Sequence, residues 1–227
     1  MIKGLWWKIT TCLLLLYAVI GGFLIDVPES IIGETMRNLF FHVGMWFGML
    51  AMLVTGFIYS LRYLRNFDEK KDVVAVEAVN VGLLFGFLGI ITGMIWANFT
   101  WGAPWVKDPK LNGAAVGLFI YLAYMILRGS IPDIHKRAKV GAVYNIFAFV
   151  LWVVFVMILP RLSGESIHPG RDNSPVLPMQ LDPSMRIVFY PAMAGWILLG
   201  FWIMEIRVRM RKLRMHLEDD APIKEKT

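Results

Sequence analysis

Two of the four histidines in this sequence are the side chains best suited to ligate a metal. They are His42, which follows a Phe-Phe pair, and His168, which precedes a Pro-Gly pair. A neutral imidazole is a common ligand of transition metals, and two imidazoles from separate segments can take both axial positions on one iron. His135 and His216 stand among lysines and arginines, which is typical of solvated side chains. The candidate metal-ligating pair is therefore His42 and His168.

A cluster of tryptophans provides a second candidate feature. Trp96, Trp101 and Trp105 fall within ten residues, in a segment that also contains Gly102 and Asp108. Tryptophans often line membrane interfaces, and such an aromatic belt explains single tryptophans at helix ends. It explains three in one short segment less well, because large flat side chains also suit stacking against a large flat ligand.

The two features together indicate a haem site. Haem is planar and amphipathic, so its ring could stack on the tryptophans and its iron could be held between His42 and His168. Its propionates would need cations. The candidates are Lys107, Lys110, Arg161, Arg171 and Arg186, and we favour Arg186 because it ends the segment that carries His168.

The elements that position these residues are predicted to be membrane helices. Hydrophobic residues make up 57% of the chain and charged residues 18%, below the roughly 25% usual for soluble domains. A spanning helix needs about 20 mostly apolar residues. We therefore expect an all-α integral membrane protein with six transmembrane helices, at about 5–25, 39–61, 73–96, 112–128, 142–160 and 187–206.

The distribution of positive charge predicts the orientation of the six spans. With the N-terminus inside, seventeen lysines and arginines fall on the cytoplasmic side and six on the other. The positive-inside rule then places both termini in the cytoplasm and turns the segments 26–38, 97–111 and 161–186 outward. The net charge of +6 thus reflects membrane orientation, and we expect no binding of nucleic acid. We expect a membrane domain over 1–207, with outer loops at 96–112 and 161–186, and a basic, then acidic, cytoplasmic tail over 208–227.

The tryptophan segment also carries a family resemblance. The run Trp101-Gly-Ala-Pro-Trp105-Val-Lys-Asp108-Pro-Lys-Leu111 resembles the tryptophan-rich signature of the haem-handling proteins of cytochrome c assembly. Six spans, a histidine opening the second and another in the last outer loop are similar to the CcmC branch, haem exporter protein C of system I. The segment Leu181-Asp-Pro-Ser-Met-Arg186 is also similar to that branch. The resemblance covers about the first 210 residues.

That resemblance implies a function in haem delivery without catalysis. It implies that b-type haem binds transiently at the outer, periplasmic face of the inner membrane, with His42 and His168 as axial ligands and with Trp101, Trp105 and Asp108 in the haem-presenting loop. The implied partners are a membrane-anchored haem chaperone, the subunits of an ATP-binding-cassette complex and a small membrane subunit. This chain has no Gly-rich phosphate loop of its own. It departs from the family at Lys107 and Asn112, where the family usually has Trp and Thr.

Three other functions compete with this interpretation. A b-type cytochrome would place histidines within facing helices, but here only His42 lies in a predicted span. A small-solute transporter would carry polar groups at mid-span, and Glu77, Asn80 and Glu205 lie instead near span ends, where they are more often structural. The synthase of the other assembly system shares the tryptophan-rich loop, although such chains are generally longer, so it is the main alternative.

Overall fold

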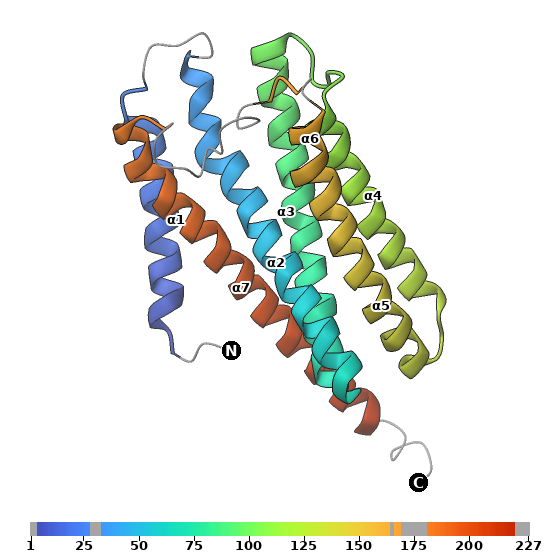
Figure 1. Cartoon of the computed structure of the whole chain (residues 1–227). Coiled ribbons are helices and arrows are strands. Elements are labelled where there is room, and N and C mark those ends of the chain that lie inside the picture. Colours follow the sequence, from blue (N-terminus) through green and yellow to red (C-terminus); the bar gives the residue numbers. More distant parts are fainter. Residues whose placement is uncertain (1–3, 28–32, 164–165, 169–180, 221–227) are drawn as a thin grey trace.

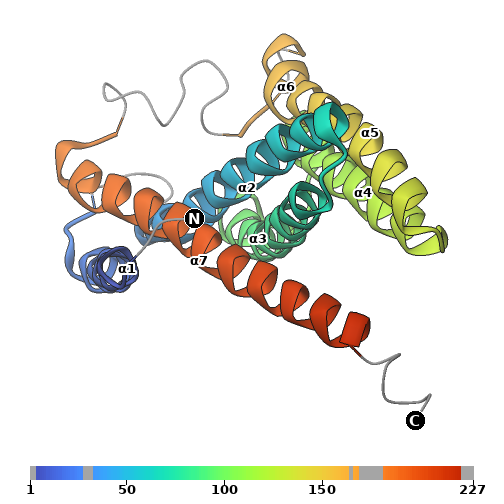
Figure 2. The same ribbon diagram turned by 90° about the horizontal axis from the view of Figure 1, so that it is seen from below.

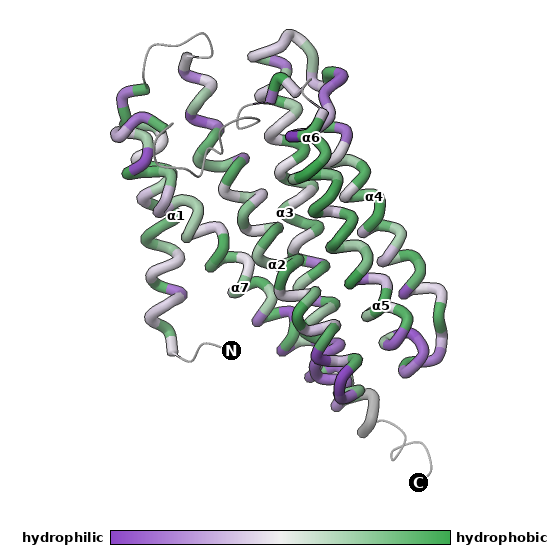
Figure 3. Tube along the Cα trace, in the orientation of Figure 1, coloured by the Kyte–Doolittle hydropathy of each residue, from purple (hydrophilic) through white to green (hydrophobic). Residues whose placement is uncertain are grey.

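The computed structural model describes residues 4–27, 33–163, 166–168 and 181–220, and over these residues the chain is a bundle of helices (Figure 1). Six segments are long and apolar enough to cross a membrane, which confirms the predicted number of spans. Polar residues of the described part gather toward the ends of the bundle and apolar residues between them (Figure 3). The chain is therefore a multi-pass membrane protein of the all-α class.

Apart from the first, the spans are longer than the apolar stretches that predicted them, because backbone hydrogen bonding continues into the polar flanks. The second span, for example, continues five residues beyond its predicted end, to Asn66. The elements in order are α1 (Trp6–Leu24), the 3₁₀-helix η1 (Gly33–Asn38), α2 (Leu39–Asn66), α3 (Glu69–Trp101), α4 (Pro109–Ser130), α5 (Ile134–Val153), the π-helix η2 (Val154–Ile158), α6 (Leu159–Leu162) and α7 (Pro183–Asp220).

Helices α2 and α3 form the centre of the bundle. Seen along the bundle, α1 and α7 lie on one side of this pair and α4 and α5 on the other (Figure 2). The main core lies where α2 and α3 meet α4, α5 and α7, and its fully buried members include Met49, Met52, Leu53, Val79, Phe85 and Tyr121. A smaller cluster joins α1, α2 and α7 around Phe40 and Phe189.

The tryptophan segment is only partly a loop, which differs from the irregular segment expected over 96–112. Helix α3 continues through Trp96 to Trp101, since no glycine or proline lies between Trp96 and Gly102 to end it. Gly102 then adopts a φ of +77° and its N–H donates to the Asn98 carbonyl, a helix-ending geometry that glycine permits. The irregular part is therefore confined to residues 102–108.

The wall formed by α5, η2 and α6 owes its shape to Pro160. Proline has no N–H, so it cannot donate to the carbonyl four residues earlier, and the chain passes through a π-turn just before it. Helix α4 packs so closely against η2 that a Cβ added at Gly113 would lie 2.1 Å from the Phe155 carbonyl oxygen. The π-helix is thus held directly against α4.

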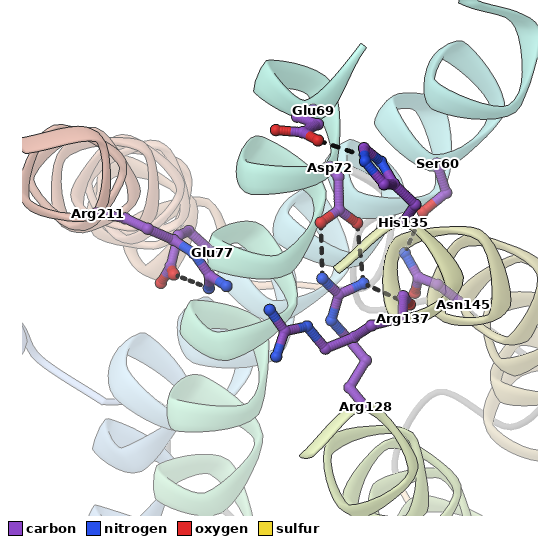
Figure 4. A network of polar contacts seen from close by, with 9 residues as sticks. All are labelled: Ser60, Glu69, Asp72, Glu77, Arg128, His135, Arg137, Asn145 and Arg211. Carbon is purple, nitrogen blue, oxygen red and sulfur yellow. Dashed lines mark hydrogen bonds and ion pairs between the residues drawn. The ribbon is translucent and has the colours of Figure 1, made fainter. Parts of the chain in front are cut away.

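At the end of the bundle where α7 terminates, buried polar contacts tie the helices together (Figure 4). Arg128 of α4 donates to both carboxylate oxygens of Asp72 of α3, at 2.8 and 2.6 Å. The Asn145 amide of α5 donates to the Ser60 hydroxyl of α2 at 2.9 Å. These contacts connect α2 with α5, and α3 with α4, at the end remote from the tryptophan segment.

Candidate haem-binding cavity

His42 lies in the first turn of α2 and is buried, with 6% of its surface exposed. Its Nδ1 is 3.1 Å from the Thr92 hydroxyl oxygen. The Thr92 hydroxyl already donates to main-chain carbonyls of its own helix, at 2.9 Å to Leu88 and 3.1 Å to Gly89. The oxygen of Thr92 therefore accepts a hydrogen bond from Nδ1–H, and the lone pair of His42 is left on Nε2.

Aromatic rings surround His42. The ring of Trp96 meets it edge-on at 5.8 Å between centroids, and the ring of Trp46 does so at 6.3 Å. The Trp96 indole N–H donates to the Thr35 hydroxyl at 3.1 Å, which fixes its orientation. The His42 side chain is thus held by a hydrogen bond to Thr92 and by packing against the indole rings of Trp46 and Trp96.

His168 approaches from the segment 166–168, far along the chain from His42. The centroid of its ring lies 5.9 Å from the ring centroid of Trp101. The Nδ1 atom of His168 is buried without a hydrogen-bond partner among the described residues. Burial, with the nearby positive charge of Lys110 and the neighbouring His42, lowers the pKa of His168 to about 3. The imidazole is therefore neutral at physiological pH, the form that ligates metals.

Asp108 holds the segment that carries His168. Its Oδ1 caps α4 by accepting from the N–H groups of Lys110 and Leu111, at 2.8 and 3.2 Å. Its Oδ2 accepts from the Ser166 hydroxyl at 2.9 Å and from the Ile167 N–H at 2.8 Å. Although burial would raise the pKa of Asp108, these hydrogen bonds hold it below its usual value. One buried carboxylate thus joins α4 to the segment that carries His168.

Both histidines line one cavity of about 430 Å³, which is within the range of ligand pockets. The Trp96, Trp101 and Trp105 side chains also line it. Its remaining lining is largely apolar and comes from α2, α3, α4, α5 and η2, including Trp46, Phe47, Leu50, Ile90, Trp152 and Val156. The cavity therefore combines two imidazoles with an aromatic and aliphatic wall.

Three other predicted site residues do not line this cavity. Gly102 ends α3, and Asp108 is fully buried beside the cavity wall. The Nε of Arg186 in α7 donates to the Leu181 carbonyl at 2.6 Å. Gly102 and Asp108 thus shape the site from outside it, and their roles toward a ligand stay predictions, as does that of Arg186.

Several residues that shape the cavity were not singled out from the sequence. Trp46 lies one helical turn after His42, and this i, i+4 spacing is a signal that could have been used. Thr92 and Trp152 carry no such local signal, because tertiary packing alone brings them to the site. Asn112, a departure from the family pattern, accepts a hydrogen bond from the Trp105 indole N–H at 3.2 Å.

The ligand groups fit an iron porphyrin better than a bare metal ion. Within the described part of the chain, no group of three or more His, Cys, Asp or Glu side chains is placed to hold a metal. A structural zinc site takes four protein ligands. A porphyrin supplies four nitrogens itself, so two imidazoles suffice.

The ionic contacts at the opposite end do not resemble a transport pathway. Glu77 of α3 is buried and pairs with two arginines of α7, Arg207 at 2.7 Å and Arg211 at 2.8 Å. Figure 4 shows the pair of Glu77 with Arg211. Asn80 donates to the same carboxylate at 3.1 Å. Glu77 is therefore engaged in packing α7 against α3, as the structural alternative predicted.

Comparison with known proteins identifies the family. The model of the family described as Heme exporter protein C matches residues 3–221. This chain belongs to that family. It is 27% identical over 207 residues to Heme exporter protein C of Paracoccus denitrificans, a match that covers 88% of this chain and 82% of the relative. The protein of the same name from Escherichia coli K12 is 24% identical over 226 residues, covering 96% and 86%.

A shorter similarity extends to the main alternative. Cytochrome c biogenesis protein CcsA of Pelargonium hortorum is 30% identical over 118 residues, which covers 52% of this chain and 36% of that protein. Membership in the heme exporter protein C family supports a role in haem handling for cytochrome c biogenesis.

Proposed function

We propose that this protein binds haem in the cavity between α2, α3 and η2, presents it at the outer face of the inner membrane and delivers it to a membrane-anchored haem chaperone. The observation that carries the proposal is that His42 and His168, more than a hundred residues apart in sequence, line one cavity. In this arrangement His42, through its Nε2, and His168 would hold the iron of haem.

The residues around His42 prepare it for this role. Because Thr92 accepts the Nδ1 proton, the imidazole keeps the tautomer that offers Nε2 to iron. Trp96 and Trp46 restrict rotation of the ring by packing against it. His42 is therefore the more rigid of the two proposed ligands.

The tryptophans suit a site that must also release its ligand. Trp101 and Trp105 line the cavity, and Trp105 is 37% exposed, so they cover haem without enclosing it. The proposed recipient can then approach the exposed edge. The chaperone, the ATP-binding-cassette subunits and the small membrane subunit remain proposed partners, and the chain itself is proposed to deliver haem without catalysing a reaction.

A synthase-type function has one observation in its favour, the similarity to CcsA. That match covers about half of this chain, whereas the matches to Heme exporter protein C cover most of it. Delivery to a chaperone is therefore the function we place first.

The proposal is tested by haem retention in tryptophan variants. Trp101→Ala and Trp105→Ala, purified from haem-replete cells, should each retain less haem per protein than the unmodified chain. They should also transfer less haem to a co-expressed haem chaperone. Trp6→Ala is the matched control, because Trp6 is exposed on α1 away from the cavity. Equal retention in all three variants would leave the aromatic-belt interpretation in place.

A further inference from the structure

Two glycines of α3 lie directly against two aromatic side chains of α2. A Cβ added at Gly93 would lie 2.8 Å from the Cε1 atom of the His42 ring, and one added at Gly89 would lie 2.9 Å from the Cε2 atom of the Trp46 indole. The two glycines are one helical turn apart on α3, as His42 and Trp46 are on α2. Both glycines also line the cavity. A side chain at either position would therefore push an aromatic ring of the site away from α3.

The His42 ring is held in place by contacts on several sides. It packs edge-on against Trp96 and Trp46, and its Nδ1 lies 3.1 Å from the hydroxyl oxygen of Thr92. The Cε1 atom that meets Gly93 is bonded to both ring nitrogens, so a methyl group at position 93 would displace Nδ1 and Nε2 together. Because Thr92 lies on the same helix as Gly93, moving the ring away from α3 would also lengthen its hydrogen bond to Thr92. The missing side chain of Gly93 thus permits the hydrogen bond that Thr92 makes.

This hydrogen bond affects the strength of His42 as a ligand. When the Nδ1–H of an imidazole donates a hydrogen bond, its Nε2 becomes a stronger donor to a metal. A stronger axial donor favours ferric over ferrous iron, and hydrogen bonding around the axial ligands is one means by which a protein tunes haem. The Nδ1 of His168 has no such partner among the described residues. Within the described part of the site, His42 is therefore the histidine whose ligand strength a neighbouring side chain sets.

We propose that Gly93 and Thr92 are positioning residues that act through His42, by holding its imidazole against α3 with the Nδ1–H hydrogen bond formed. This inference rests on the proposed function, and it adds two residues that tune one of the proposed ligands. Gly89 supports the arrangement indirectly, because it gives room to Trp46, which packs against His42.

The test measures the reduction potential and the absorption spectrum of the haem-loaded protein in detergent. Gly93→Ala pushes the ring from α3, and Thr92→Val removes the hydrogen-bond acceptor. Each variant should bind ferric haem, relative to ferrous haem, about tenfold less tightly, the lower end of the cost of losing a partner of a metal-ligating histidine. A tenfold change raises the potential by about 59 mV for one electron. Thr92→Ser keeps the hydroxyl and should keep the potential of the unmodified protein.

Two further variants separate positioning from helix packing. Gly86→Ala is the matched control, because a Cβ at Gly86 would lie 2.7 Å from the Leu118 Cδ2 and 2.9 Å from the Met49 Sδ, outside the cavity lining. It should lower the melting temperature and leave the potential unchanged. The double variant Gly93→Ala/Thr92→Val should have the same potential as either single variant, since both changes remove one hydrogen bond.

An unchanged potential in Thr92→Val, or in a folded Gly93→Ala, would overturn the inference and leave the proposed function intact. If Gly93→Ala does not fold, the comparison of Thr92→Val with Thr92→Ser decides the inference, because neither variant adds a side chain at the crowded position. A raised potential in Gly86→Ala would also overturn it, since the effect would then come from helix packing. Failure of the unmodified protein to bind haem would instead overturn the proposed function.

Discussion

Among single side chains, Asp108 shows how a residue can serve a site that it does not touch. The family resemblance placed it in the haem-presenting loop, and in the structure it is the last residue of the 102–108 segment and the N-cap of α4. It joins the start of α4 to Ser166 and Ile167, directly before His168. We therefore treat Asp108 as a positioning residue for the second proposed ligand.

Replacing Asp108 should misplace His168. In Asp108→Ala the segment 166–168 loses two hydrogen bonds, so the spectrum of bound haem should resemble that of a His168→Ala variant. The matched control is Asp133→Ala, because Asp133 also caps a helix, accepting from the Lys136 N–H at 2.6 Å, but lies away from the cavity. Each variant should lose about 0.5–2 kcal/mol of cap stabilisation. An unchanged haem spectrum in Asp108→Ala would contradict the positioning role.

The sequence predicted the existence and the number of the membrane helices well, but it predicted the positions of their ends poorly. Apolar stretches of spanning length predicted the six spans, because the bilayer makes composition and length informative. The helical course of Trp96 to Trp101 and the π-turn before Pro160 were not predicted, since both depend on packing and local backbone geometry.

The same distinction applies to the candidate site. The sequence pointed to His42, His168 and the tryptophans by residue type, and the structure places these side chains along one cavity. It pointed to Arg186 by proximity in the chain, and the role of Arg186 stays a prediction. The structure places Lys110 and Arg161, from the separate helices α4 and α6, along the same cavity. Arg171 lies outside the described residues.

The buried pair of Asp72 and Arg128 should stabilise α3 against α4 without affecting haem. Arg128→Met leaves a buried carboxylate without its partner, which costs about 3–5 kcal/mol. The variant should therefore melt at a lower temperature than the unmodified protein, with an unchanged spectrum of bound haem. Glu69→Gln is the control, because the Glu69–His135 pair is exposed (Figure 4) and contributes little. An unchanged melting temperature in Arg128→Met would show that this pair does not hold the helices together.

In the bundle as a whole, the cavity and the ionic contacts occupy opposite ends. The start of α1 and the end of α7 lie at the end that carries the Asp72–Arg128 and Glu77–Arg211 pairs (Figure 1). The segment with His168 lies at the other end. The positive-inside prediction assigns the first end to the cytoplasm, and the cavity then faces outward.

Thiol labelling tests this orientation. In a background of Cys12→Ser, a cysteine introduced at position 167, where Ile167 is 58% exposed, should react with an impermeant thiol reagent in intact cells, and one at position 135 should react only after lysis. Cys12 is exposed on α1 and must be removed first. Labelling at 135 but not at 167 in intact cells would reverse the proposed orientation.

The most direct measurement for the haem assignment is the absorption spectrum of the purified, haem-loaded protein and its single histidine variants. The unmodified protein should show the spectrum of iron with two histidine ligands. His42→Ala and His168→Ala should each shift the Soret band and lose that spectrum, and His135→Ala, changed at an exposed position near the other end, should not. Identical spectra in all four proteins would contradict the proposal that His42 and His168 hold the iron.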